Sequence, residues 1–357
     1  MLSPAENSRV SNLVHPTPSL PFNNKYIHIK AIGSGGEATC DRYEEAGVGT
    51  AVAVKTVVRP NPHTNYLHEA DVLATLPKHP RTIELLEVFQ GQEEPLRIVM
   101  PLYTGGDITQ TVKKFSLFGT KIPESFIWHS FLQLIDGIHH LHTNPVLPVL
   151  HRDLKPENLL IEAPGEGKLF DNIKIIDFGM ATTNTDPHEH RGGTPKYQPP
   201  ESPIASKAAD VYAAGACVYF MLTGKAPKPE CPGHIQSHAR HAFYSNSPQL
   251  VQRIVHSDHT DFYPDNQPLS YDEAVKATFN HATPLPRKGY SPLLEYWLMR
   301  ALDPNAETRA TTTELLANMA ADANKQIDFY LKWVPVSNER PLCRFAYPEP
   351  PAGWRPE

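Results

Sequence analysis

The chain has 357 residues, a formal net charge of -6 and 20% charged residues. This length fits one large domain or two lobes that share a cleft, and the mildly acidic balance argues against nucleic acid or an anionic membrane as a partner. No apolar run is long enough to span a bilayer, and the first residues lack the charged and apolar regions of a secretion signal.

The cysteines indicate a reducing compartment. They are too far apart for a disulfide framework or a zinc knuckle, at Cys40, Cys217, Cys231 and Cys343. Because isolated thiols suit a reducing environment, we expect a cytoplasmic or nuclear protein.

The first third of the chain predicts a small sheet. Residues 1–24 are rich in Ser, Pro and Asn and predict a disordered N-terminal segment. Short β-like runs follow at 26–32, 50–58, 84–89 and 96–103. One helix is expected within residues 65–76, where apolar side chains recur at helical spacing and Thr64 or Asn65 would cap the start.

After Gly106 the pattern becomes helical. An apolar stripe through residues 126–141 predicts a core-facing helix, and the almost wholly apolar residues 210–222 predict a buried helix that ends at Gly224. Short strands are expected around 158–161 and 173–176. The sequence therefore predicts an α+β fold with two lobes, a small β-rich lobe with one main helix and a larger, mostly helical lobe.

Three features of the small lobe suit phosphate binding. GSGGEA at 33–38 lies between two strands, and its glycines would let backbone amides approach an anion. Lys55 lies on the next strand and Glu69 on the following helix, and an ion pair between them would place an ammonium group at phosphate oxygens. Taken alone, these features are explained better by an ordinary turn and by solvated charges.

The large lobe carries a far more specific combination. HRDLKPEN at 151–158 is followed by DFG at 177–179, and both come after GSGGEA and VAVK. In this order the motifs resemble the eukaryotic protein kinase family, serine/threonine type. The resemblance covers residues 25–323, with a small lobe at 25–102 and a large lobe at 103–323. Further landmarks that resemble the family are GTPKYQPPE at 193–201, Asp210 and Arg309.

The resemblance implies transfer of the γ-phosphoryl group of Mg·ATP to serine or threonine hydroxyls of proteins. Asp177 and Asn158 would bind Mg²⁺, or Mn²⁺ as a substitute, because hard divalent ions prefer oxygen ligands. Asp153 would accept the proton of the substrate hydroxyl. Lys155 would neutralise charge on the transferring group, and a lysine here resembles the serine/threonine branch of the family.

The resemblance also implies an ATP site against the small lobe. Lys55, held by Glu69, would orient the α- and β-phosphates. Pro101 would offer its carbonyl to adenine, which requires no amide hydrogen. Ala53 and Leu160 would sandwich the base but are equally explained as plain core. The complete set of expected nucleotide contacts is Ile32, Gly33, Ser34, Gly35, Gly36, Cys40, Ala53, Lys55, Met100, Pro101, Tyr103, Asp107 and Leu160.

Two departures from the family pattern are mild. Ala38 replaces the third glycine of the loop, and Pro199 replaces the alanine of the Ala-Pro-Glu motif. Glu201 should still pair with Arg309 and hold the end of the activation segment. Since every residue essential for catalysis is present, an active kinase is favoured. The alternatives are a pseudokinase-like scaffold or regulatory binding module, and a small-molecule phosphotransferase, against which the peptide platform at 193–201 argues.

Regulation is less clearly encoded. Arg152 is typical of kinases that are switched by a phosphate in the activation segment, but a second basic residue after DFG is absent. Phosphorylation at Thr182, Thr183 or Thr185 therefore stays an open alternative. Thr194 is expected to bond Asp153 and Lys155 as a structural hydroxyl. A spine is expected from the stacked residues Leu73, Leu85, His151 and Phe178.

Partners are expected to be protein substrates. Asp107 and Glu157 match positions at which acidic side chains favour arginine before the acceptor, so a basophilic preference is expected. Residues 225–290 form a long insertion that would dock a substrate or regulator. Three histidines there would share a helix face, for which a solvated or partner-facing surface is favoured over zinc binding: His234, His238 and His241. The tail 324–357 is rich in aromatic residues and is expected to pack on or beside the kinase domain.

Overall fold

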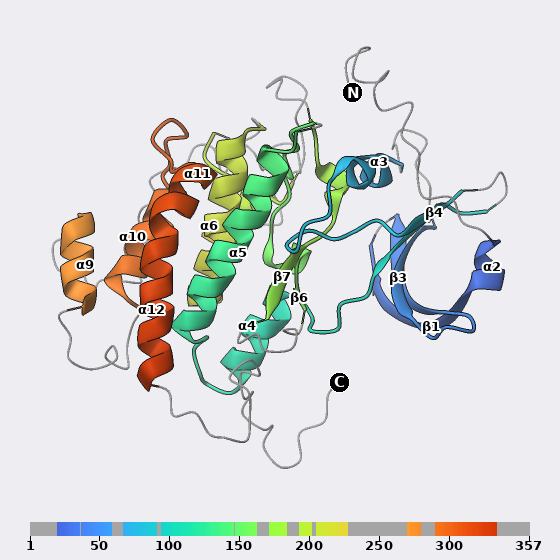
Figure 1. Cartoon of the computed structure of the whole chain (residues 1–357), viewed down its shortest axis with the longest axis horizontal. Coiled ribbons are helices and arrows are strands. Elements are labelled where there is room, and N and C mark those ends of the chain that lie inside the picture. Colours follow the sequence, from blue (N-terminus) through green and yellow to red (C-terminus); the bar gives the residue numbers. More distant parts are fainter. Residues whose placement is uncertain are drawn as a thin grey trace, which may run out of the picture.

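The computed structural model describes residues 20–35, 37–58, 67–90, 94–145, 147–162, 171–183, 193–201, 205–227, 270–279 and 290–333. These residues form a small lobe built on an antiparallel sheet and a larger helical lobe (Figure 1). The predicted α+β architecture with two lobes is therefore confirmed. None of the helices in these ranges is long and apolar enough to cross a membrane.

The small lobe is a five-stranded antiparallel sheet in the order β1-β2-β3-β5-β4. In β3, Val52, Val54 and Val57 are buried, while Lys55 is partly exposed. Lys55 is therefore the charged side chain of a strand whose valines belong to the core. The strands are β1 (Tyr26–Ser34), β2 (Ala38–Glu45), β3 (Ala51–Val57), β4 (Glu87–Phe89) and β5 (Arg97–Pro101).

One main helix, α3 (His68–Thr75), accompanies this sheet, as predicted (Figure 1). It begins later than the expected range of 65–76. Leu67 occupies the N-cap position and makes no side-chain capping bond, whereas the two expected caps, Thr64 and Asn65, lie outside the described residues.

The disorder predicted for residues 1–24 is wrong for its last part. Phe22 begins a short helix, α2 (Phe22–Lys25), and only 1% of its surface is exposed. Its ring packs edge-on against Tyr43 and Phe89, each at 5.1 Å between centroids, and the Arg97 guanidinium lies 4.3 Å from its centroid. A single aromatic residue therefore anchors the chain to the sheet, although the surrounding composition is that of a disordered segment. Residues 1–19 lie outside the described part.

Replacing Phe22 with alanine should lower the free energy of unfolding by about 3 kcal/mol, because it empties a buried aromatic site. Urea unfolding of the purified chain would measure the change. Leu20→Ala is the matched control, since Leu20 is 52% exposed and its truncation should change stability by less than about 0.5 kcal/mol. Equal effects of the two substitutions would contradict the anchoring role of Phe22.

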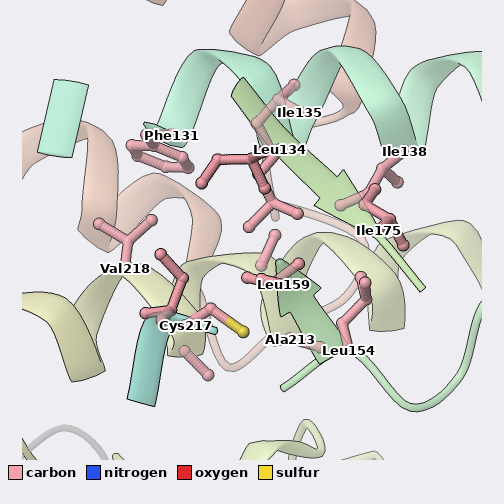
Figure 2. Close-up of a cluster of buried hydrophobic side chains, with 14 of the residues drawn as sticks. Phe131, Leu134, Ile135, Ile138, Leu154, Leu159, Ile175, Ala213, Cys217 and Val218 are labelled. Atoms are coloured by element: carbon pink, nitrogen blue, oxygen red, sulfur yellow. The ribbon is translucent and has the colours of Figure 1, made fainter. Parts of the chain in front are cut away.

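Helices α5 (Glu124–His142) and α6 (Lys207–Thr223) form the centre of the large lobe. Figure 2 shows Phe131 and Leu134 of α5 in the same buried cluster as Cys217 of α6. Both helices confirm their predictions: the apolar stripe of α5 is buried, and α6 ends at Gly224, whose φ of 72° suits a residue without Cβ. Burial raises the pKa of the Cys217 thiol well above its usual value, so it is an inert core residue.

The other elements surround this pair. The hairpin of β6 (Leu159–Glu162) and β7 (Asn172–Ile175) confirms the two short strands that the sequence predicts. Other helices in the described part of the chain are α4 (Ile108–Leu117), α9 (Tyr271–Phe279), α10 (Pro292–Ala301), α11 (Thr312–Glu314), a π-helical turn at Leu315–Met319 and α12 (Ala320–Trp333).

Two predicted segment boundaries differ from the structure. The tail was expected to begin at 324, but α12 continues across this point and Ile327 is buried in the main core. Within the expected insertion 225–290, helix α9 belongs to the lobe: Ala274 is fully buried, and the Thr278 hydroxyl accepts a bond from the Leu293 amide at 3.0 Å. The three histidines of this insertion lie outside the described residues.

Candidate active site

A charged triad joins the two lobes. Lys55 of β3 places its Nζ 2.6 Å from Oε2 of Glu69 on α3 and 3.0 Å from Oδ1 of Asp177, which follows β7. Burial alone would lower the pKa of Lys55, but the two carboxylates outweigh it and raise the pKa above the usual value. Burial would raise the pKa of Asp177, but the Lys55 ammonium holds it below the usual range. All three groups are therefore paired, and both Lys55 and Asp177 are charged at neutral pH.

A second cluster surrounds Asp153 in the loop between α5 and β6. Lys155 Nζ donates to Asp153 Oδ2 at 2.7 Å, and the Thr194 hydroxyl donates to Oδ1 at 2.7 Å. Lys155 also lies 3.4 Å from the Thr194 oxygen. The prediction that Thr194 bonds both residues is confirmed. Asp153 is thus fixed by two donors from different segments, and only 7% of its surface is exposed.

Asn158 connects the two clusters. Its side-chain nitrogen donates to the Asp153 carbonyl at 2.9 Å, and its own carbonyl accepts from the amide of Ile176, the neighbour of Asp177, at 3.0 Å. Because the side-chain nitrogen is engaged, the amide oxygen is the atom of Asn158 that suits a cation. Together with the Asp177 carboxylate this is an all-oxygen donor set, and Mg²⁺ prefers oxygen ligands. The residues present therefore fit a magnesium site.

Asp210 of α6 holds the backbone of the HRD motif. Its carboxylate accepts from the amides of His151 and Arg152 at 2.8 and 2.9 Å, and it lies 2.9 Å from His142 Nε2. Burial would raise the pKa of Asp210, but the bond to His142 and the other donors lower it. Arg152 has a φ of 69°, a strained left-handed conformation for a residue with a side chain. These bonds hold that turn and thereby position Asp153. Sequence reasoning missed His142, since nothing sets one histidine in a helix apart.

The expected stacking around the HRD histidine is present in part. The rings of His151 and Phe178 meet edge-on at 5.0 Å between centroids. Leu73 and Phe178 belong to one hydrophobic cluster, and Leu85 packs against it.

Glu201 and Arg309 form the pair expected at the end of the activation segment. Two guanidinium nitrogens meet the two carboxylate oxygens at 2.6 and 3.0 Å. Arg309 also donates to the carbonyls of Ala208 and Asp303, each at 2.8 Å, and its side chain is fully buried. The Tyr212 ring also lies over this guanidinium, 5.0 Å from the ring centroid to Cζ.

The residues expected to contact adenine lie on neighbouring elements. Ala53 of β3 pairs in register with Met100 of β5, and both are buried. Asp107 bridges to Leu160 of β6, which brings the ribose and base candidates together. The Asp107 carboxylate also caps α4 by accepting from the Gln110 amide at 2.7 Å, so its expected ribose contact must coexist with a structural role.

The glycine-rich loop is a tight hairpin. The Gly35 amide donates to the Ala38 carbonyl at 2.8 Å, and Cys40 of β2 lies opposite both Gly33 and Lys55. Ile32 is half-exposed on β1. Gly36 lies outside the described residues.

The geometry agrees with a comparison against known families. The family profile described as "Protein kinase domain" matches residues 26–319. The chain belongs to the protein kinase family. Members of this family generally use ATP and Mg²⁺ and act on protein substrates.

Relatives of this kinase are themselves named as kinases, one of them as a probable serine/threonine-protein kinase. It is 30% identical over 214 residues to sperm motility kinase 3A of Mus musculus, covering 58% of this chain and 40% of the relative. It is 27% identical over 308 residues to CBL-interacting protein kinase 24 of Oryza sativa subsp. japonica, covering 82% and 55%. It is 31% identical over 220 residues to the probable serine/threonine-protein kinase KCC4 of Saccharomyces cerevisiae, covering 57% and 20%. The kinase thus spans only about half, or less, of the length of these relatives.

Proposed function

We propose that this kinase is catalytically active and transfers the γ-phosphoryl group of Mg·ATP to serine or threonine hydroxyls of proteins. The observation that carries the proposal is the linkage of the Lys55–Glu69–Asp177 triad to the Asp153 cluster through Asn158. Ion-binding oxygens, an ammonium group for phosphates and a candidate base thereby belong to one site. A pseudokinase would be expected to lack at least one of these elements.

Each side chain has a distinct proposed role. Asp153 accepts the proton of the incoming hydroxyl and orients its oxygen, because its two donors fix the carboxylate in place. Lys155, whose Nζ lies 2.7 Å from Asp153 Oδ2, neutralises charge that develops on the transferred group. Lys55 orients the α- and β-phosphates. Asp177 and Asn158 would hold Mg²⁺ or Mn²⁺, which when bound supplies positive charge to the phosphate oxygens.

We further propose that the nucleotide contacts are those the sequence indicates. The glycine-rich hairpin would cover the phosphates with backbone amides. Ala53, Met100 and Leu160 would form the apolar walls around adenine. The other proposed contacts are Ile32, Gly33, Ser34, Gly35, Gly36, Cys40, Pro101, Tyr103 and Asp107.

Identification of the modified amino acid tests the substrate class. The purified chain would be incubated with γ-labelled ATP, Mg²⁺ and a mixed basic protein substrate, and the product hydrolysed to amino acids. We expect phosphoserine and phosphothreonine. Phosphotyrosine alone would overturn the substrate class while leaving phosphoryl transfer intact, and phosphorylation of small molecules alone would favour the small-molecule phosphotransferase.

A preference for basic substrates is the finer part of the proposal. Glu157 is exposed beside the catalytic loop, and its charge helps to raise the pKa of Asp107, after the larger effect of burial. Because the negative charges of Asp107 and Glu157 interact, the two carboxylates together would attract an arginine of a substrate peptide. A peptide library should show enrichment of arginine before the acceptor, and Glu157→Gln should reduce it. No enrichment in the unmodified kinase would contradict the preference.

Thr194→Val should lower kcat about 10-fold to 100-fold, because a hydrogen bond to an ionised carboxylate contributes roughly 1.5–3 kcal/mol. The substitution removes the donor that meets Asp153 Oδ1 and keeps the shape of the side chain. Steady-state kinetics with a peptide substrate would measure it. Thr194→Ser is the matched control and should keep most of the activity, since it retains the hydroxyl. Full activity of the valine variant would contradict this role.

A further inference from the structure

His68 connects helix α3 to the segment that follows DFG. Its Nε2 lies 2.6 Å from the carbonyl oxygen of Ala181, although the two residues are 113 positions apart. A carbonyl oxygen can only accept, so Nε2 carries the hydrogen. His68 is partly exposed, whereas Ala181 is 2% exposed. The bond therefore ends on a carbonyl that is screened from water, where losing the donor is costly.

The neighbour of His68 is the residue that holds Lys55. Glu69 binds Lys55 at 2.6 Å, and consecutive residues on one helix are separated by a fixed rotation of about 100°. A bond that fixes the rotation of His68 therefore also fixes the direction of Glu69. This makes the His68 contact relevant to the charged triad and not only to the end of the helix.

The acceptor segment is itself anchored on the large lobe. Arg152 Nη1 donates to the Met180 carbonyl at 3.3 Å. The amide of Leu150 donates to the Thr182 carbonyl, and the Thr182 amide donates back, both at 2.8 Å. Three consecutive carbonyls, at 180, 181 and 182, are thus held by Arg152, His68 and Leu150.

Two basic side chains bond the main chain of the described residues 180 and 181. Arg152 and His68 bond the carbonyls of adjacent residues. The hydroxyl oxygen of Thr183, the next residue but one after Ala181, is buried. A modifying enzyme would not reach this hydroxyl in the present conformation, and the segment is held here by hydrogen bonds from the unmodified chain.

We propose that His68 is a positioning residue that keeps α3 in its catalytic place through Ala181, so that this kinase works without a phosphate on its activation segment. The inference rests on the proposed function for its kinetic consequence. It assigns to His68 a mechanical role that acts through Glu69 and Lys55, without contact to the nucleotide.

Two substitutions separate this role from general stability. His68→Met has a similar length and no donor, and we expect kcat to fall about five- to tenfold with little change in KM for ATP. His68→Gln restores a donor of similar reach and should recover at least half of the activity. His139→Met is the matched control, because His139 Nδ1 also makes one hydrogen bond, with the Thr312 hydroxyl at 3.1 Å, between helices α5 and α11 of the large lobe. We expect it to keep full activity.

Hydrogen–deuterium exchange supplies a readout that does not depend on catalysis. Residues 68–75 and 178–183 should exchange faster in His68→Met than in the unmodified chain, while α5 and α6 keep their protection. If both the exchange and kcat of His68→Met match those of the unmodified chain, the positioning role is overturned. An inactive unmodified chain would refute the proposed function, whereas the exchange experiment would still decide whether His68 holds α3.

Phosphate independence has its own test. The unmodified kinase treated with a protein phosphatase, and the variant with Thr182→Ala, Thr183→Ala and Thr185→Ala combined, should each keep activity within about twofold. Loss of activity in both, restored to the treated kinase by rephosphorylation, would overturn this part of the inference.

Discussion

Asp153→Asn is expected to lower kcat by about 10³-fold, because the amide cannot accept the proton of the substrate hydroxyl and general base catalysis contributes roughly 10²- to 10⁴-fold. The carboxylate receives Lys155 Nζ on one oxygen and the Thr194 hydroxyl on the other, each at 2.7 Å. Asparagine keeps one acceptor and the shape of the side chain, so the fold and the nucleotide site should persist. Steady-state kinetics measures the loss, and titration with Mg·ATP should give a Kd within about threefold of the unmodified value.

The matched control for this experiment is Asp171→Asn. Asp171 lies just before β7 and is partly exposed, and it is outside the contacts that join the two site clusters. We expect normal kcat from this variant. An Asp153→Asn variant that transfers phosphate at the unmodified rate would contradict the role of Asp153 and favour an interpretation in which the chain is a scaffold.

Arg309→Met should lower the free energy of unfolding by about 3–5 kcal/mol, because it leaves the Glu201 carboxylate without its partner in a buried setting. The side chain of Arg309 is fully buried and that of Glu201 is 19% exposed. The substitution also removes the donor for the carbonyls of Ala208 and Asp303. Urea unfolding measures the change, and activity should fall with it, since this pair fixes the end of the segment that carries Thr194.

Arg300→Met provides the comparison. Arg300 pairs with Glu314 at 2.7 Å, but the two side chains are 31% and 34% exposed. Solvent screens such a pair, so its loss should cost less than about 1 kcal/mol. If the two arginine variants were destabilised equally, burial would not be the reason for the importance of Arg309. Addition of Glu201→Gln to Arg309→Met should recover part of the stability, because it removes the unpaired charge.

The proposed site residues can be named from sequence alone because phosphoryl transfer would dictate both their types and their order. HRDLKPEN, DFG and the lysine on β3 would carry this chemistry, and the structure brings Lys55, Asp153 and Asp177 into two linked clusters. The apolar periodicity of α5 and α6 likewise predicts the core, since a buried stripe is a local pattern. Local patterns were therefore reliable wherever the signal lies within one element.

Sequence failed where order depends on partners that are remote in the chain. Phe22 follows a stretch of disordered composition, and its burial depends on Tyr43, Phe89 and Arg97, which reach it only once the sheet has formed. The bond from His68 to Ala181 spans 113 positions and leaves no periodic signal. The end of α12 was missed because the family resemblance stops near residue 323, although the helix continues.

Phosphate transfer by the purified, unmodified chain tests the central claim most directly. The chain would be incubated with ATP labelled at either the α- or the γ-position and a protein substrate, with Mg²⁺ or with excess EDTA. We predict label on the protein only from γ-labelled ATP and only when the divalent ion is present. A folded chain that binds Mg·ATP and yet transfers no label to any protein, itself included, would contradict the account.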